Sequence, residues 1–289
     1  MKAILLKELR TYFKNPLGYV FIGMMLVILG FYYTFYTMYY QFADYYHVLN
    51  AGSSLILFVV PVLTMRIMSE EAKNKTDQLL LTAPIKTSGI VLGKFFAAAI
   101  IYTIVLVISM LQPLVTVFIF DGEMSVGMTL GGYLGFLLLG LAFISIGMFI
   151  SSLTENQLIA AVVTIGVFSL LNLTEGIQGT FPASRYFSLF VLIGLAAILL
   201  AIIYRSIRDI KVTGIVGAGI LVLIVATFLI WPASYEGLIA TIMSSLSIFE
   251  RYAHMFYGMF DFGHIVFFIS LIIFFLYITY QVVEKKRWS

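Results

Sequence analysis

The densest group of charged side chains lies between Arg66 and Lys86, and three consecutive leucines follow most of the charges. A solvated loop does not need three adjacent leucines, whereas a helix that docks in a groove of a soluble partner does. The leucines could equally bury against the membrane face, and the residues alone favour neither interpretation. The range 69–86 is therefore a candidate contact segment for a partner protein. Its candidate contact residues are Glu70, Glu71, Lys73, Lys75, Thr76, Asp77, Leu79, Leu80 and Leu81.

Residue sets for catalysis, metal binding or nucleotide binding are not found in the sequence. The absence of cysteine excludes disulfides, thiolate metal sites and cysteine nucleophiles. His47, His254 and His264 lack the paired spacing of metal ligands, so interfacial or hydrogen-bonded histidines are favoured. The range 89–95 resembles a phosphate-binding loop, but it is one residue short and lacks the hydroxyl after the lysine. We expect no catalytic residues, no bound cofactor or metal, and no nucleic-acid partner.

Composition predicts that most of the chain faces lipid. Of its 289 residues, 62% are hydrophobic and 11% are charged, and the mean hydropathy is +1.05. Soluble domains carry about 25% charged residues. A membrane span needs about 20 apolar residues, so the chain has room for several spans and almost no soluble domain. Any activity that needs a folded, water-soluble domain must therefore be supplied by a partner protein.

The apolar runs predict an all-α polytopic membrane protein with about eight transmembrane helices in one domain, 1–289. The runs lie at about 17–42, 51–68, 89–120, 128–152, 157–173, 186–204, 212–231 and 263–283. Pro113 predicts a kink in the third run, because proline removes a backbone hydrogen bond and clashes with the preceding turn. The range 232–262 is too broken by charges and proline to span, and predicts short external helices at the interface.

An interfacial helix is predicted over 1–16. Leu5, Leu9 and Phe13 recur at helical spacing, and the polar residues fall largely on the opposite side. The polar residues singled out in this helix are Lys7, Glu8 and Arg10. Pro16 should end it, because the residue before a proline is pushed out of the α region. The alternative is that residues 1–16 form a frayed, polar N-terminal segment instead of an interfacial helix. The charges also break any long apolar stretch, so we expect no cleaved signal peptide.

Basic residues indicate the orientation of the spans. With eight spans, 15 of the 17 lysines and arginines fall on one side, and only Arg185 and Arg251 on the other. Positive charge marks the cytoplasmic side of a membrane protein. Both termini are therefore predicted to be cytoplasmic, in the inner or cytoplasmic membrane. Misplacing one span would scatter the basic residues over both sides, so the charges favour eight spans as well.

The centres of the predicted spans contain no Asp, Glu, Lys or Arg. Ion-coupled carriers usually place ionisable groups at membrane depth. Their absence indicates that the energy for any transport comes from another subunit. A facilitator for a neutral substrate needs no such groups and remains an alternative.

Two further patterns concern packing and anchoring. Gly131 and Gly135 form a small-residue motif that favours close helix packing, either within the chain or at a dimer face. The aromatic residues of 31–46 lie where an outer aromatic belt belongs, which favours anchoring over substrate stacking.

Several motifs together resemble the type-2 ABC transporter permeases, most closely the gliding-motility-type permeases. They are Lys7-Glu8-Leu9-Arg10 and Asn15-Pro16 at the start, Glu70-Glu71, Lys73, Thr76, Leu79 to Thr82, Pro84-Ile85 and Ile90 to Phe95, Ser152 to Gln157, and Phe249-Glu250, Gly258, Asp261 and Glu284 to Trp288 near the end. The resemblance covers nearly the whole chain, and the range 69–86 is its most specific part.

The resemblance implies a permease that works with other subunits. It implies that 69–86 is a coupling helix resting on cytoplasmic ABC ATPase subunits, which bind ATP and Mg. It also implies a second permease subunit, the same or different, a re-entrant hairpin before the last span, and export. Two features differ from the family pattern: Lys75 replaces a glycine before Thr76, which suggests a more helical or differently docked turn, and 174–235 adds two helices to the usual six.

The function predicted from the sequence is therefore the permease subunit of an ATP-driven exporter. An ATP-independent facilitator or channel, or a membrane scaffold without transport, is the alternative. The sequence does not define the substrate.

Overall fold

The computed structural model describes residues 1–42, 44–78, 85–119, 124–178, 182–207, 210–255 and 262–288. The protein is all-helical, with 88% helix and no strands among these residues. It divides into two compact units, Met1–Leu170 with Arg251–Ser289 (unit 1) and Leu171–Glu250 (unit 2). Each unit is described by itself.

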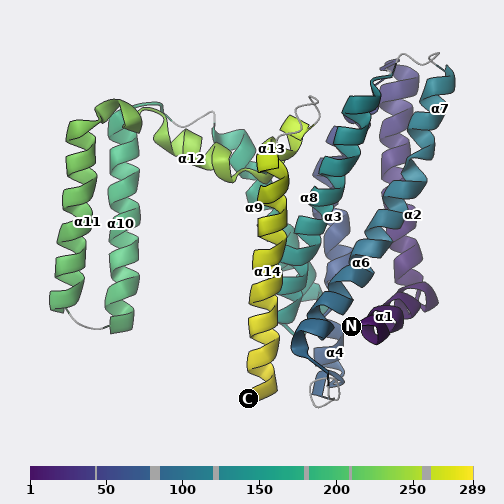
Figure 1. Cartoon of the computed structure of the whole chain (residues 1–289), viewed down its shortest axis with the longest axis horizontal. Helices are drawn as coiled ribbons and strands as arrows, with labels where there is room; N and C mark the ends of the chain where they lie inside the picture. Colours follow the sequence, from purple (N-terminus) through teal and green to yellow (C-terminus); the bar gives the residue numbers. More distant parts are fainter. Residues whose placement is uncertain are drawn as a thin grey trace. The chain divides into compact units, whose positions relative to one another are not determined.

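Unit 1 is a bundle of long helices with short helices at its two ends (Figure 1). Its helices are α1 (Lys2–Lys14), α2 (Pro16–Tyr33), the π-helix η1 (Thr34–Tyr39), α3 (Tyr46–Thr64), α4 (Ser69–Lys73), α6 (Thr87–Ser109), α7 (Leu111–Ile119), α8 (Val126–Ser152) and α14 (Phe262–Trp288). Unit 2 contains α10 (Arg185–Ile207), α11 (Ile210–Ile230), the 3-10 helix η2 (Pro232–Tyr235) and α12 (Leu238–Leu246). Two helices, α9 (Gln157–Gln178) and α13 (Ile248–His254), cross the boundaries between the units.

Five stretches of described residues are long and apolar enough to cross a membrane. They are Pro16–Tyr39, Tyr46–Lys73, Thr87–Ile119, Val126–Ser152 and Phe262–Trp288. The other three predicted spans coincide with shorter apolar helices, Gln157–Leu173, Arg185–Ile198 and Gly217–Ile230. The predicted all-helical fold is thus confirmed, with five candidate membrane spans among the described residues, and the count of eight spans stays a prediction.

Both predicted proline breaks are present. Asn15 is extended, with φ −92° and ψ 149°, and Pro16 is the first residue of α2, a position where its missing N–H costs nothing. The third predicted run is interrupted at Met110, between α6 and α7. Met110 lies three residues before Pro113, in the turn whose carbonyl groups the proline ring crowds. These breaks need only local sterics, so the sequence predicts them.

The core of unit 1 is built around α8, which is buried over most of its length. Two of its glycines receive side chains from neighbouring helices: the Tyr102 ring of α6 lies over Gly140, and Thr64 of α3 lies over Gly147. A side chain at either glycine would come within 2.5 Å of these atoms. The Tyr102 hydroxyl donates to the Phe136 carbonyl of α8 at 2.7 Å, which satisfies it inside the bundle.

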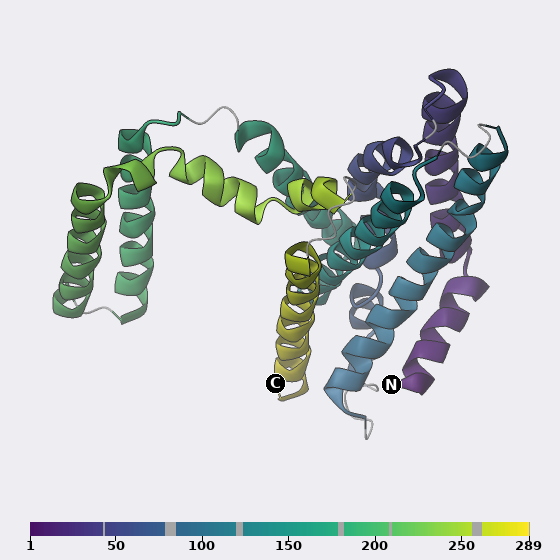
Figure 2. The ribbon, with the colours of Figure 1, turned by 45° about the horizontal axis from the view of Figure 1, so that its top comes forward.

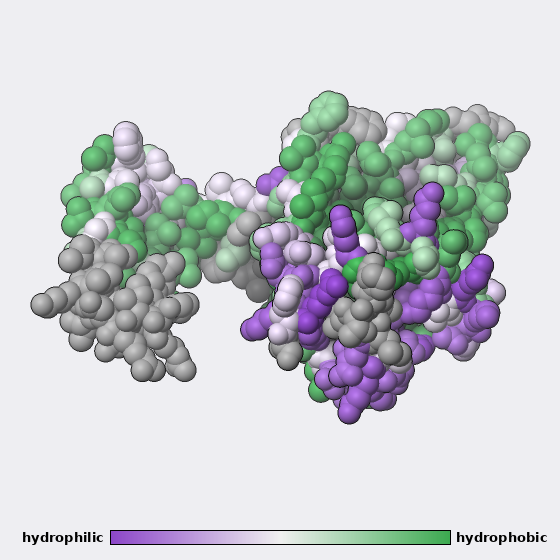
Figure 3. Space-filling model, turned by 60° about the horizontal axis from the view of Figure 1, so that its bottom comes forward, coloured by the Kyte–Doolittle hydropathy of each residue, from purple (hydrophilic) through white to green (hydrophobic). Residues whose placement is uncertain are grey.

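The two ends of unit 1 differ in polarity. Both termini and α4 lie at the same end of the bundle (Figures 1 and 2). Hydrophilic residues gather at this end, whereas the sides are mainly hydrophobic (Figure 3). We call it the α4 end. At the opposite end, the Ser125 N–H donates to the Asp44 carboxylate at 3.0 Å and joins the loops before α3 and α8.

Candidate functional site: a charged junction at the α4 end

A local break in the chain separates α4 from α3 at the end of the bundle. A turn of four residues, 65–68, follows α3, and α4 then begins at Ser69. The hydroxyl of Ser151, near the end of α8, accepts from the backbone N–H groups of Met68 and Ser69, both at 3.1 Å. It also donates to the Met65 carbonyl at 3.1 Å. One buried serine therefore fixes the start of α4 to α8.

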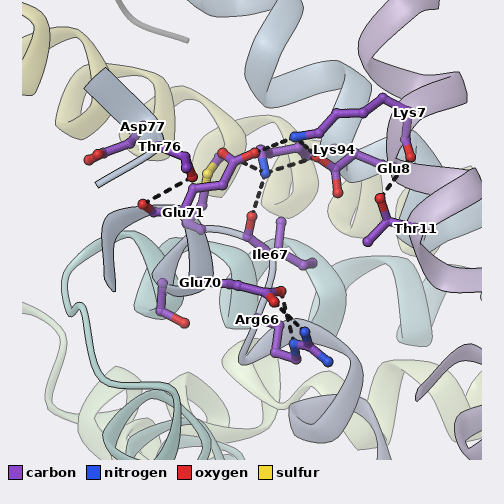
Figure 4. Close-up of polar contacts among 12 residues, drawn as sticks. Lys7, Glu8, Thr11, Arg66, Ile67, Glu70, Glu71, Thr76, Asp77 and Lys94 are labelled. Carbon is purple, nitrogen blue, oxygen red and sulfur yellow. Dashed lines mark hydrogen bonds and ion pairs between the residues drawn. The ribbon is translucent and has the colours of Figure 1, made fainter. Parts of the chain in front are cut away.

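A buried lysine of α6 connects α4 to two other elements. The Lys94 side chain is only 2% exposed. Its Nζ donates to the Ile67 carbonyl at 2.7 Å, lies 2.9 Å from Glu71 Oε2 of α4 and 3.2 Å from Glu8 Oε1 of α1 (Figure 4). A buried ammonium requires such partners, because an unpaired charge away from water is very costly.

Lys7 of α1 completes the junction. Its Nζ lies 2.5 Å from Glu71 Oε1 and 3.2 Å from Glu8 Oε1. Partial burial alone would lower the pKa of Lys7, but the hydrogen bond to Glu71 and the charges of both glutamates outweigh it and raise the pKa. Lys7 is thus charged at neutral pH. Two lysines and two glutamates form a cluster of zero net charge that joins α1, α4 and α6, which we call the charged junction.

A second ion pair supports the turn before α4. Arg66 donates to both carboxylate oxygens of Glu70, in an i,i+4 pair that is partly exposed. Beside this pair lies a cavity of about 30 Å³, also lined by Glu8, Thr11 and Tyr12. It is large enough for about one or two water molecules and has polar groups to bind them.

Two alternatives were expected for Lys75, a more helical turn or a differently docked one, and the structure contradicts the more helical turn. Lys75 adopts φ +56°, the left-handed region that favours glycine. The N–H of Thr76 donates to the Glu71 carbonyl at 3.0 Å, and the N–H of Lys75 donates to the Ala72 carbonyl at 3.1 Å. This pair of bonds is the Schellman motif that commonly ends a helix. Lys75 therefore takes a backbone conformation typical of glycine and ends α4 after five residues.

The other predicted contact residues follow this turn. The Thr76 hydroxyl donates to the Glu71 carbonyl at 3.4 Å, and an Asp77 carboxylate oxygen accepts from the Gln78 N–H at 2.9 Å. Lys73 and Lys75 are exposed. Leu79, Leu80 and Leu81, with the rest of 79–84, lie outside the described residues, so their predicted docking stays a prediction.

In the predicted interfacial helix, Glu8 points into the protein. Its side chain is 12% exposed and faces Lys94, whereas Lys7 is half exposed and Arg10 is exposed. The structure therefore differs from the sequence interpretation, which placed Glu8 with the polar residues facing away from the buried side. Helix α1 lies close to α6: a Cβ atom added at Gly93 of α6 would lie 3.1 Å from Ile4 of α1.

The glycine pair of α8 lies away from the charged junction. Gly131 and Gly135 are both buried. A side chain at Gly135 would lie 3.1 Å from the Tyr252 ring and 3.2 Å from the Met255 sulfur. At Gly135, the close packing is therefore within this chain.

Sequence reasoning missed the central role of Lys94 and Ser151. Lys94 was assigned only to the basic side of the membrane and to the family motif. A signal was present, since a lysine in the second turn of an apolar helix needs a carboxylate partner. The place of Lys94 in the sequence does not show that its partners are Glu8 and Glu71. The described residues hold no group of three His, Asp or Glu side chains suited to a metal.

Comparison with known proteins shows that part of the chain is similar to a known family. Residues 52–184 match the model of the ABC-2 family transporter proteins, over somewhat less than half of the chain. The matched range includes α4, Lys94, α8 and the turn that follows α8. No curated protein and no solved structure matches the chain. The five apolar helices indicate a multi-pass transmembrane protein, and residues 52–184 are similar to the ABC-2 family transporter proteins.

Proposed function

We propose that this chain is the permease subunit of an ABC exporter in the cell membrane, driven by separate cytoplasmic ATPase subunits that bind ATP and Mg. The observation that carries the proposal is the charged junction, two of whose residues, Glu71 and Lys94, lie in the matched range: α4 is fixed to α1 and α6 by Lys94 and to α8 by Ser151. A force applied to α4 would reach three helices of the bundle. This is the arrangement that a coupling element requires.

The topology belongs to the same proposal. The α4 end carries Lys2, Lys7, Arg10 and the basic end of α14, Lys285 to Arg287, so we assign it to the cytoplasm. Both termini are then cytoplasmic. Five apolar helices, together with the three shorter ones, make up the proposed eight spans. A second permease copy or subunit would complete the transporter, in contact with membrane lipid.

The test is association with an ATPase and stimulation of ATP hydrolysis. The chain would be co-expressed with each ABC ATPase subunit of its own genome, purified, and reconstituted in liposomes. We expect one ATPase to co-purify at a fixed ratio and to hydrolyse ATP faster with the permease than alone. Failure of every ATPase to bind a folded chain would contradict the proposal. Substrate flux through the chain alone, without nucleotide, would favour a facilitator.

Coupling variants must spare the charged junction. Glu71 bonds both Lys7 and Lys94, so charge reversal at Glu71 would disturb folding as well as coupling. Lys73→Glu combined with Leu80→Asp changes an exposed residue and the predicted apolar patch instead. We expect this double variant to insert normally and to lose ATPase stimulation. Lys14→Glu, on the exposed end of α1, is the matched control and should keep it.

A further inference from the structure

A hollow of about 420 Å³ opens at the α4 end beside the proposed coupling element. Its lining comes from two chain segments, Met65 and Lys73 on one side, and the turn between α8 and α9 with the first residues of α9 on the other. The residues of this second wall are Glu155, Asn156, Gln157 and Leu158. All of these residues belong to unit 1.

The turn between α8 and α9 has a defined structure. The Thr154 hydroxyl accepts from the Asn156 N–H at 3.2 Å. The Asn156 side chain accepts from the N–H groups of Leu158 and Ile159, at 2.9 and 3.4 Å, and caps α9. At its other end, Lys286 of α14 donates to the Ser152 carbonyl at 2.7 Å. The second wall is therefore held by capping bonds and by α14.

The end of α8, which leads into the second wall, is bonded directly to the first wall and to the start of α4. Ser151, in the last turn of α8, is the residue that bonds Met65, Met68 and Ser69. The hollow is thus a preformed feature rather than a gap between independent segments.

The lining combines opposite charges with exposed apolar surface. Lys73 and Glu155 are exposed, and among the described residues neither has an ion-pair partner. Leu158 is 73% exposed in the same hollow. Charged and amide side chains around one apolar contact are typical of the rim and centre of a protein interface. Hydrocarbon does not suit Lys73, Glu155, Asn156 and Gln157, so a lipid chain is a poor occupant.

We propose that this hollow is a second contact site for the ATPase subunit, which inserts a short helix with an apolar side chain against Met65 and Leu158. The inference rests on the proposed function, and it deepens it by adding a contact outside the segment 69–86. Charge complementarity requires a carboxylate of the partner beside Lys73 and a basic side chain beside Glu155. Lys73 belongs to α4, so a protein that covers the exposed end of α4 also covers this hollow.

Cysteine labelling tests the contact directly, because the chain has no cysteine of its own. Glu155→Cys would be labelled with a maleimide in the purified permease, alone and in complex with its ATPase. We expect labelling to slow by about fivefold or more in the complex, as for a side chain buried in an interface. Gly127→Cys, at the opposite end of the bundle with open space around it, is the control and should not change.

A binding measurement provides an independent readout. Glu155→Lys should weaken ATPase binding by about fivefold, since a charge reversal at an interface rim opposes a complementary charge. Lys14→Glu, on the same end but away from the hollow, should leave binding unchanged. Normal insertion and an unchanged melting temperature of Glu155→Lys would show that the fold is intact.

The outcomes separate this inference from the proposed function. If the ATPase binds and Lys73→Glu with Leu80→Asp disrupts coupling, while Glu155→Cys labels at the same rate in the complex, the second contact is wrong and the proposed function stands. If no ABC ATPase binds the chain, both are wrong. Slow labelling of Glu155→Cys in lipid without any ATPase would also overturn the inference, because lipid or the chain itself would then cover the hollow.

Discussion

Lys94 is the residue on which the charged junction depends. It is 2% exposed and has two carboxylates and one carbonyl within 3.2 Å. Replacing it with methionine would leave Glu8 and Glu71 close together with only Lys7 between them. Removing one partner of a buried ion pair costs about 3–5 kcal/mol. We expect Lys94→Met to lower the stability of the purified protein by about 3 kcal/mol, measured by thermal unfolding in detergent.

A double variant shows whether the loss comes from the unpaired carboxylate. Lys94→Met with Glu71→Gln should recover about 1 kcal/mol or more relative to the single variant, since residues in contact couple by amounts of this size. Equal melting temperatures for the single and double variants would mean that Lys94 and Glu71 are not coupled. Lys14, the exposed last residue of α1, serves as a control, and Lys14→Met should have little effect.

Lys75 carries backbone strain that glycine would relieve. Left-handed backbone costs an L-residue about 1–2 kcal/mol, partly offset by the greater freedom of glycine when unfolded. Lys75→Gly should therefore stabilise the end of α4 by about 0.5–1 kcal/mol. Slower amide hydrogen exchange over residues 69–78 in Lys75→Gly would show this stabilisation. Lys73→Gly, in the last turn of α4 itself, should have the opposite effect and exchange faster.

At the scale of elements, the sequence predicts those features that local chemistry determines. The break at Asn15 and the interruption before Pro113 follow from proline geometry. The extent of α4 could not be predicted, because lysine rarely takes left-handed backbone and Lys75 gives no signal of a helix end. The prediction that Glu8 faces away from the buried side of α1 was also wrong, since the buried lysine that it pairs with, Lys94, is 86 residues away in the sequence.

The contact between α1 and α6 depends on Gly93. A Cβ at this position would lie 3.1 Å from two atoms of Ile4 and 3.3 Å from the Met1 carbonyl. Gly93→Val should therefore push α1 away from α6 and cost about 1–3 kcal/mol, the usual effect of overpacking. Faster hydrogen exchange throughout α1 would accompany it.

Gly23→Val is the matched control for this change. Gly23 lies in α2, and a side chain there meets no atom within 4 Å among the described residues. If Gly93→Val left α1 as protected as Gly23→Val does, the close approach of α1 and α6 would not hold, and Glu8 could not reach Lys94 as described.

At the scale of the whole molecule, apolar composition predicts the membrane architecture, but the number of spans depends on unit 2. Its helices α10 and α11 pack on each other, and both are apolar over most of their length. A helix that is apolar all round suits a membrane span. Hydrophobicity alone does not distinguish a hairpin that crosses the bilayer twice from one that lies within it, and this is why the predicted insertion of 174–235 stays a prediction.

Labelling of single cysteines in intact cells would distinguish six spans from eight. The two termini cannot, because an even number of spans puts both on one side in either case. The informative positions are Ser184, before α10, and Lys211, in the first turn of α11.

If α10 and α11 both cross the membrane, an impermeant maleimide labels Ser184→Cys from outside the cell. It labels Lys211→Cys only after the membrane is opened. Gly127→Cys and Lys14→Cys are the external and internal controls. Labelling of Ser184→Cys and Lys211→Cys from the same side would reduce the count to six and would leave the junction at α4 unaffected, because every residue of that junction belongs to unit 1.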